Sequence, residues 1–222
     1  MDLMEAMRQR HSVRRYDPRP LEPAHAAALE ALVDACNRES GLHIQLVKDE
    51  PQAFDSAMAH YGKISGVTNY LALVGKKDAM LDETCGYYGE KLVLEMQRMG
   101  LNSCWVALTF KKIPDAYTVL PGEKLALVIA LGYGLTQGAP HLSKPATVVS
   151  NLSENSPAWF LDGVAAALLA PTAVNQQKFR LEYTDEKGRA KPGVGFYTKI
   201  DLGIVKYHFE LGSGRGKDIW LK

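Results

Sequence analysis

Cysteine is scarce in this 222-residue chain, and its few cysteines form no recognisable pattern. Cys36, Cys85 and Cys104 stand far apart, and no two of them form a CxxC pair. An odd and sparse count argues against a disulfide framework or a zinc cluster, and it fits a reducing, cytoplasmic compartment. The six histidines are equally dispersed, so we expect no metal site. The three cysteines are therefore expected to fill apolar space in the core.

Long apolar runs and an excess of one charge are also missing. Apolar stretches such as 125–131 fall far short of the roughly 20 residues that cross a bilayer, and the acidic start at 1–5 does not resemble a secretory signal. Lys and Arg total 26 against 25 Asp and Glu, a formal net charge of +1. No global basic field is available for nucleic acid or an anionic membrane. We therefore expect a cytoplasmic protein whose partner is a small molecule.

No glycine-rich phosphate loop is apparent. Gly132-Tyr133-Gly134 follows an expected strand, but no third glycine and no helix come next, which argues against a dinucleotide-binding fold. The glycines in 212–216 lie near the C-terminus without a strand that leads into a helix. This segment is expected to be a flexible tail.

What the chain does have is an ordinary globular composition, 46% hydrophobic, with helices and strands in alternation. Helices are expected at 1–9, from 22 onward with Ala27, Ala28, Ala31, Leu32 and Ala35 as the buried face, and at 54–60, 83–99, 156–170 and 201–211. Strands are expected at 42–48, 70–75, 124–133, 178–183 and 195–199. A long connection should cover 137–155. The pattern predicts an α+β fold, with a mixed sheet that carries helices on both faces.

The second part of the chain repeats the order of the first. If Ala31 is aligned with Ala166, then Ile44 falls on Phe179 and Leu46 falls on Leu181. Helix, turn and strand then coincide under one offset. The pattern favours an internal pseudo-repeat, although few residues are identical.

The most distinctive motif is Arg10-His11-Ser12-Val13-Arg14-Arg15-Tyr16. Arg10 and Arg14 are four residues apart, so a helical or turn-like backbone would bring both guanidinium groups to one side. Such groups make charge-assisted, bidentate contacts with a phosphate, and Ser12 adds a hydroxyl suited to a polyol chain. The alternative is a solvated basic turn that pairs with Glu5 and Asp17.

Two further segments, 100–105 and 170–177, carry amide side chains at corresponding joints of the two parts. Asn and Gln amides can donate and accept at the edge of a ring that has carbonyls and ring nitrogens. Their alternative role is to cap a helix end or to fix a turn. Trp105 could form one wall of a ring pocket or fill the core.

Together these three stretches resemble the signature segments of the FMN-dependent nitroreductase family. The resemblance covers most of the chain and implies a nitroreductase-like α/β/α sandwich with a mixed, mainly antiparallel sheet. It implies no catalytic side chain, because the flavin performs the redox chemistry. The implied FMN ligands are Arg10, His11, Ser12 and Arg14 for the phosphate and ribityl chain, Ala107 and Leu108 beside the ring, Pro171, Thr172, Asn175 and Gln176 from the second part, and Lys144 at the phosphate. The acceptor pocket is expected to be lined by Tyr87, Tyr88, Trp105 and Phe110.

The order of the motifs differs from that of an ordinary member. The family usually has the Asn-bearing stretch soon after the arginines, where this chain has only a degraded version at 36–41. The intact stretch at 170–177 resembles the fused branch, in which one chain imitates the family's dimer. The resemblance therefore implies a first half at 1–150 and a second half at 151–222 within one compact unit. It also implies one FMN per chain, in a monomer with a pseudo-twofold axis or in a homodimer.

The implied activity is transfer of hydride from NADH or NADPH to a nitroaromatic, a quinone or an enone. Three alternatives remain open from the sequence. The chain could be a flavin-binding sensor or carrier without turnover, an enzyme that performs another flavin reaction on the same scaffold, or an interaction domain whose basic segment binds nothing specific.

Overall fold

The computed structural model describes residues 1–221, apart from the side chains of Met58 and His60. The chain forms two compact units built from interleaved segments. The sheet unit comprises Arg10–Leu81 and Leu92–Pro140, and the hairpin unit comprises Met1–Gln9, Asp82–Lys91 and the chain from His141 onward. These units group residues by contact, whereas the predicted halves at 1–150 and 151–222 describe a repeat, so that division stays a prediction. Among residues 1–221, no helix has the length and apolarity needed to cross a membrane.

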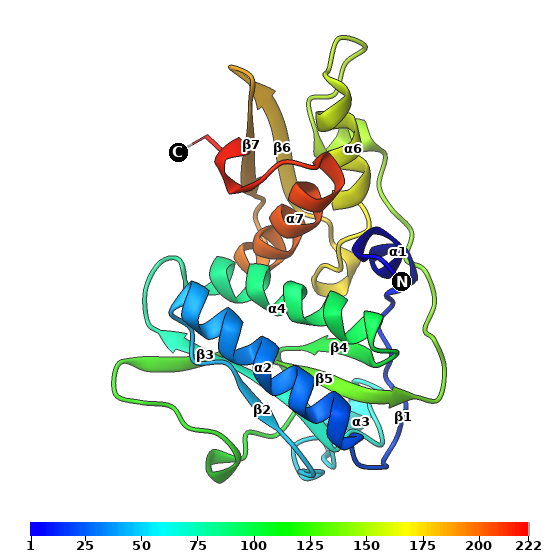
Figure 1. The fold of residues 1–222 in the computed structure, drawn as a ribbon, viewed down its shortest axis with the longest axis vertical. Helices are drawn as coiled ribbons and strands as arrows, with labels where there is room; N and C mark the ends of the chain where they lie inside the picture. The colour runs from blue at the N-terminus through cyan, green and yellow to red at the C-terminus, as the bar shows by residue number, and fades with distance from the viewer. Residues whose placement is uncertain (222) are drawn as a thin grey trace. The chain divides into compact units, whose positions relative to one another are not determined.

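The sheet unit is organised around one long central strand, β5 (Figure 1). Its strands are β1 (Tyr16–Asp17), β2 (Gln45–Val47), β3 (Asn69–Lys76), β4 (Asn102–Val106) and β5 (Glu123–Gly134). Strand β5 pairs antiparallel with β3, β4 and β1, and β2 extends the sheet beyond β3. Isolated parallel bridges join Ser12 to Ser103 and Arg15 to Ser65. The predicted α+β fold with a mainly antiparallel sheet is confirmed.

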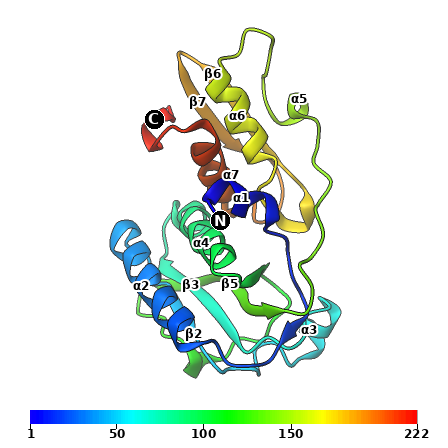
Figure 2. The ribbon, with the colours of Figure 1, turned by 45° about the vertical axis from the view of Figure 1, so that its right-hand side comes forward.

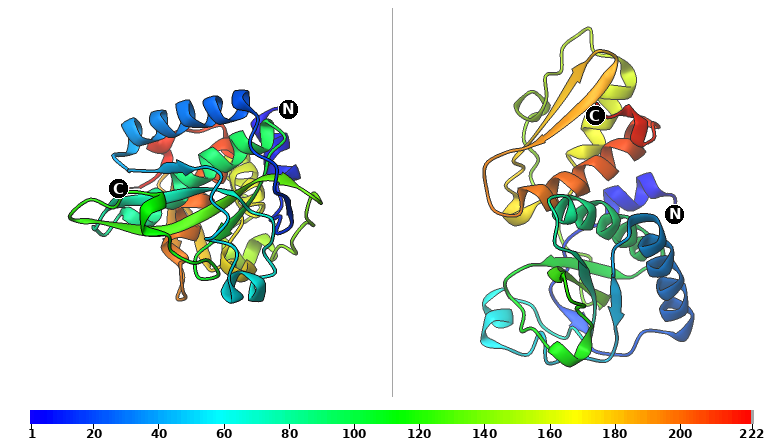
Figure 3. Two further views of the ribbon diagram at one scale, coloured as in Figure 1. Left: turned by 90° about the horizontal axis from the view of Figure 1, so that it is seen from below. Right: turned by 90° about the vertical axis from the view of Figure 1, so that its left-hand side faces the viewer.

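Helix α2 (Pro23–Ser40) runs alongside this sheet, as the right-hand view of Figure 3 shows. Its buried residues are Leu29, Val33 and Cys36. The predicted alanine face is wrong, because Ala27 and Ala31 are exposed. Leucine and valine remove more apolar surface from water than alanine does, so the larger side chains determine which face is buried.

Helix α4 (Leu81–Arg98) contributes residues to both units, and its second half lies in the core of the sheet unit. Leu92 and Met96 are fully buried there. Gly100 adopts a left-handed φ of 78°, and the N–H of Leu101 donates to the carbonyl of Met96 at 2.9 Å. This is the glycine C-terminus that the sequence predicted. The unit is completed by α3 (Ala57–Tyr61) and a short 3-10 helix at Pro114–Ala116.

The hairpin unit contains the helices α1 (Leu3–Gln9), α5 (Ala146–Val149), α6 (Ala158–Ala167) and α7 (Thr198–Ser213), the 3-10 helices at Ala173–Asn175 and Lys217–Ile219, and the strands β6 (Phe179–Thr184) and β7 (Lys187–Pro192). Figure 2 shows β6 and β7 as a hairpin beside α6. Asp185 and Glu186 form its two-residue turn with φ values of 50° and 58°, the twist that tight hairpins favour. The predicted strand at 195–199 is wrong, because β7 follows this turn at once and α7 begins at Thr198.

Close helix contacts in the hairpin unit depend on glycine. A Cβ placed at Gly86 of α4 would lie 2.0 Å from the carbonyl oxygen of Ile200, and one placed at Gly163 of α6 would lie 2.6 Å from the Phe209 ring. Both contacts bring helices of this unit against α7. The imidazole of His208 lies 2.9 Å from the Glu90 carboxylate in the same core, and both side chains are fully buried.

The C-terminal segment is held in place, so the predicted flexible tail is wrong. Helix α7 continues through Ser213 and ends at the left-handed Gly214. Beyond it, the indole Nε1 of Trp220 donates to the Glu210 carboxylate at 2.6 Å, and the N–H of Leu221 donates to the carbonyl of Gly188 at 2.8 Å. The glycine content suggested disorder, whereas the aromatic anchor that follows the glycines orders the segment.

Candidate functional site

The arginine motif is an extended segment, not the helix or turn that its spacing suggested. Ser12 forms a bridge with Ser103 beside β4, and the N–H of Val13 donates to the carbonyl of Ser103 at 3.0 Å. In extended backbone, alternate residues share a face. Arg10, Ser12 and Arg14 therefore project to the same side, and the expected grouping of the two arginines arises from a period of two.

The three side chains of this face lie close enough to the thiol of Cys104 to affect its pKa. Burial raises the pKa of that thiol, while the charges of Arg14 and Arg10 and a hydrogen bond from Ser12 act in the opposite direction. Cys104 is 3% exposed, as expected for a core cysteine, but the sequence did not reveal its cationic surroundings. Two guanidinium groups and a hydroxyl near one point form a donor set that suits a phosphate dianion.

The backbone of residues 134–138 supports this extended segment. Gly138 has a left-handed φ of 74°, and a Cβ there would lie 2.7 Å from the Cβ of His11 and 3.0 Å from the carbonyl oxygen of Ser12. The side chain of Asn102 donates to Gln137 at 3.0 Å and accepts from the N–H of Gly134 at 2.9 Å. The Asn102 amide therefore fixes a turn, which is the alternative role considered for it. No pattern in the sequence identified Gly138, because its importance depends on a close approach in space.

Ala107 and Leu108, predicted to lie beside the flavin ring, follow β4 in the sheet unit. Of the residues predicted for the acceptor pocket, Trp105 lies within β4 and Phe110 follows it. Leu108 is 66% exposed, and Ala107 and Trp105 are half-buried. The ring of Phe110 lies 6.4 Å from that of Phe54 and packs against the buried cluster that contains Phe54. Contacts of these four residues with a flavin or an acceptor stay predictions.

The second predicted segment forms a tight structure that we call the amide bend, residues 172–177. Val174, Asn175 and Gln177 adopt left-handed φ values of 45°, 55° and 44°. Each such residue costs about 1–2 kcal/mol, and the conformation is least favourable for a β-branched valine. Backbone of this kind persists only where its neighbours hold it.

Two charged side chains hold the amide bend. The carboxylate of Asp201 accepts from the N–H of Ala173 at 2.9 Å and from Nε2 of Gln176 at 2.7 Å. The ammonium group of Lys144 donates to the carbonyls of Gln176 at 2.7 Å and Gln177 at 3.3 Å. Lys144 thus has partners within the hairpin unit, and its role at a phosphate stays a prediction.

The amides of the bend are largely bonded to one another and to the preceding chain. Nδ2 of Asn175 donates to the carbonyl of Leu142 at 2.9 Å, and Nε2 of Gln177 donates to Oδ1 of Asn175 at 2.9 Å. The hydroxyl of Thr172, which follows Pro171, accepts from the N–H of Gln177 at 3.0 Å. Oε1 of Gln176 is buried without a hydrogen-bond partner. The bend is therefore a pre-formed structure with one unused buried acceptor.

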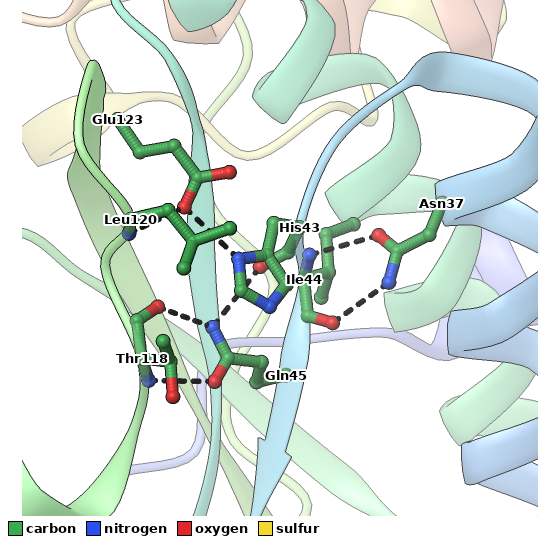
Figure 4. A network of polar contacts seen from close by, with 7 residues as sticks. All are labelled: Asn37, His43, Ile44, Gln45, Thr118, Leu120 and Glu123. Atoms are coloured by element: carbon green, nitrogen blue, oxygen red, sulfur yellow. Dashed lines mark hydrogen bonds and ion pairs between the residues drawn. The ribbon is translucent and has the colours of Figure 1, made fainter.

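The degraded counterpart at 36–41 has a structural role, which Figure 4 shows. The Asn37 side chain accepts from the N–H of Ile44 at 2.8 Å and donates to its carbonyl at 2.9 Å. Gly41 ends helix α2 with a φ of 72°. The amide of Asn37 is thus used to join α2 to β2.

Tyr87 and Tyr88, predicted to line the acceptor pocket, lie on the first half of α4 in the hairpin unit. The hydroxyl of Tyr87 donates to Glu210 at 2.5 Å, and Nζ of Lys217 donates to the hydroxyl of Tyr88 at 2.9 Å. Burial raises the pKa of Tyr87, and the bond to Glu210 adds to the effect. Their role in an acceptor pocket stays a prediction.

The structure thus gathers two sets of predicted residues, each within its own unit. The sheet unit brings together Arg10, Ser12 and Arg14, and the hairpin unit brings together Lys144, Thr172, Asn175 and Gln176. Asp201 and Gly138 were missed. Among the side chains that the structure describes, which do not include that of His60, no group of three or more His, Cys, Asp or Glu could hold a metal ion.

Comparisons with known proteins complement this geometry. The profile of a family described as "Putative TM nitroreductase" matches residues 2–213. The fold is similar to that of a "putative nitroreductase" from Thermotoga maritima, with 22% identity, a TM-score of 0.69, and coverage of 96% of this chain and 83% of that one. It is also similar to a "putative nitroreductase in complex with FMN" from Desulfovibrio desulfuricans, with 18% identity, a TM-score of 0.52, and coverage of 71% and 99%. A "nitroreductase-like protein" from Streptococcus mutans gives 16% identity, a TM-score of 0.55, and coverage of 68% and 98%. No curated protein matches the chain.

Proposed function

The chain belongs to this nitroreductase family, and from that premise we propose that it is an FMN-dependent oxidoreductase. It uses NADH or NADPH to reduce a small acceptor such as a nitroaromatic, a quinone or an enone. The observation that supports the cofactor most directly is that Arg10, Ser12 and Arg14 project from one side of an extended segment and all act on the Cys104 thiol. The donor chemistry of that group fits the phosphate end of FMN.

Each residue of the group has a distinct task in this proposal. The two guanidinium groups neutralise the phosphate and cannot lose their protons, and the Ser12 hydroxyl can donate or accept at the polyol chain. Gly138 lets the backbone of residues 134–138 pass against His11, which keeps the extended segment in place. When bound, FMN supplies the redox chemistry, so the chain needs no side-chain nucleophile.

Binding is tested by flavin titration of the apoprotein, with absorbance and fluorescence as signals. Each charge-assisted contact is worth about 1.5–3 kcal/mol, so Arg10→Ala combined with Arg14→Ala should weaken FMN binding by about 10²–10⁴-fold. Arg15→Ala is the matched control. It removes the same charge from an exposed residue on the other face of the extended segment, and it should leave the affinity within about threefold.

Turnover is tested by steady-state oxidation of NADH and NADPH with each class of acceptor. Sustained consumption that depends on the acceptor is expected. Tight FMN binding without consumption would favour a flavin carrier or sensor instead. Failure of the wild-type protein to bind FMN at all would refute the proposal.

A further inference from the structure

Lys217 is an exposed residue whose ammonium group is turned toward the hairpin unit that carries it. Its Nζ lies 4.5 Å from the centroid of the Tyr87 ring and 4.8 Å from that of the Tyr88 ring. Nζ also donates to the hydroxyl of Tyr88 at 2.9 Å. An exposed lysine ordinarily keeps its ammonium group in water, so these two rings and the hydroxyl compete with solvent for it.

The two rings belong to a small site that we call the tyrosine cage, formed by Tyr87, Tyr88 and Glu210. The ring centroids are 5.2 Å apart and the rings are inclined at 61°, so a single cation can approach both. Glu210 is 8% exposed, and its carboxylate accepts from the hydroxyl of Tyr87 at 2.5 Å. Burial raises the pKa of Glu210, and the nearby charge of Lys217 is among the effects that oppose this rise. Aromatic rings backed by a carboxylate are suited to an organic ammonium ion.

The segment that carries Lys217 has anchors other than this contact. Trp220 donates to Glu210, and the N–H of Leu221 donates to the carbonyl of Gly188. The lysine side chain is a flexible four-carbon stem, so its ammonium group can turn into solvent while the backbone stays in place. The cage can therefore change its occupant without a change of fold.

We propose that the tyrosine cage is a binding site for a small organic ammonium ion, and that Lys217 is the resident occupant that such a ligand displaces. A primary ammonium fits best, because it can donate to the Tyr88 hydroxyl as the lysine does. The tethered lysine has a high effective concentration beside the cage, so the apparent ligand affinity is reduced by the fraction of time for which the cage is filled. The inference is independent of the proposed flavin chemistry.

The test is an NMR titration with n-butylammonium, which matches the lysine side chain in length and charge, at constant ionic strength. The signals followed are the ring protons of Tyr87 and Tyr88. Lys217→Ala empties the cage and should bind the ion about tenfold more tightly than the wild type does. Lys199→Ala is the matched control, because it removes another exposed lysine on α7, and it should behave as the wild type does. Uncharged 1-butanol should not displace the ion.

A second substitution, made in the Lys217→Ala protein, locates the ion. Tyr88→Phe keeps the ring and removes the hydroxyl. It should weaken n-butylammonium several-fold and leave tetramethylammonium unchanged, because the latter has no N–H to donate. If folded Lys217→Ala binds n-butylammonium no more tightly than Lys199→Ala does, Lys217 only anchors its segment and the proposal is overturned. A gain in affinity that Tyr88→Phe does not reduce would place the ion outside the cage and would also overturn it.

Discussion

Gly138 passes so close to His11 that a Cβ at position 138 would lie 2.7 Å from the Cβ of His11. The contact joins the chain after β5 to the extended segment that carries Arg10, Ser12 and Arg14. The placement of the proposed phosphate ligands therefore depends on the lack of a side chain at Gly138, elsewhere in the sheet unit.

Gly138→Ala should disturb this contact. Two effects add, because alanine is strained at a φ of 74° and its methyl group collides with the backbone and side chain at 11–12. We expect a loss of about 2–4 kcal/mol in the free energy of unfolding and several-fold weaker FMN binding. Urea denaturation and flavin titration measure the two effects.

Gly122→Ala is the control for Gly138→Ala. Gly122 has a similar φ of 85°, but nothing lies within 4 Å of the Cβ it would gain. It should cost about 1–2 kcal/mol from backbone strain alone and should leave FMN affinity unchanged. Equal effects of the two substitutions on flavin binding would contradict the role given to the contact at His11.

The arginine segment at 10–16 shows which structural features a sequence pattern predicts. The residue types at 10–16 predicted the phosphate chemistry, but the spacing of four between Arg10 and Arg14 was interpreted with the wrong backbone. A helix places residues four apart on one side, and so does a strand, so the correct grouping followed from an incorrect conformation. The pairing of Ser12 with Ser103 holds this segment in an extended conformation. Because the two residues are far apart in the sequence, no local pattern encodes this pairing.

The Asn37 amide satisfies both backbone groups of Ile44, whose side chain is 2% exposed (Figure 4). Asn37→Ala would leave a donor and an acceptor without that partner, so we expect a loss of about 2–4 kcal/mol in the free energy of unfolding. Arg38→Ala, at the exposed neighbouring residue, should stay within about 0.5 kcal/mol. The FMN stoichiometry should be one per chain in both the wild type and folded Asn37→Ala. Two sites in the wild type and one in Asn37→Ala would show that the degraded stretch also binds flavin.

Residues that act through distant partners were the ones that sequence patterns could not identify. A single acid within the apolar run 200–205 was a signal for Asp201, since a buried charge requires partners, but it did not reveal which partners. The expected flexible tail at 212–216 was misjudged because its glycines form a local pattern, whereas the order comes from Trp220, which is bonded to Glu210 ten residues back. Strong apolar runs such as β3 and β5 were predicted within one or two residues, because burial on both faces leaves a local pattern.

The anchor at Trp220 should contribute measurably to stability. Trp220→Phe keeps a ring against Phe209, 4.8 Å away between centroids, but removes the donor to Glu210. We expect a loss of about 1.5–3 kcal/mol for that substitution and a larger loss for Trp220→Ala, since the ring contact also disappears. Val194→Ala, at a residue 94% exposed, should change the free energy of unfolding by less than about 0.5 kcal/mol. If Trp220→Ala unfolds at the same urea concentration as the wild type, the C-terminal segment is not held as described.

Asp201 should also make stability depend on pH in a definite direction. Burial raises the pKa of its carboxyl group from the ordinary 3.8 to about 6, against the opposing bonds from Ala173 and Gln176. The folded protein therefore binds this proton more tightly than the unfolded chain does. The resulting stabilisation is complete below about pH 4 and is lost as the pH rises through about 6.

An asparagine at position 201 cannot titrate, so the comparison of wild type with Asp201→Asn isolates this group. A rise of roughly two pKa units corresponds to about 3 kcal/mol, and the stability of the wild type relative to the variant should fall by about that amount between pH 4 and pH 7. Urea denaturation of both proteins at intervals of one pH unit measures the difference, because titrations elsewhere in the chain are common to both. A difference that stays constant across this range, or that grows in favour of the wild type, would mean that Asp201 is not the buried acid that the hydrogen bonds to Ala173 and Gln176 imply.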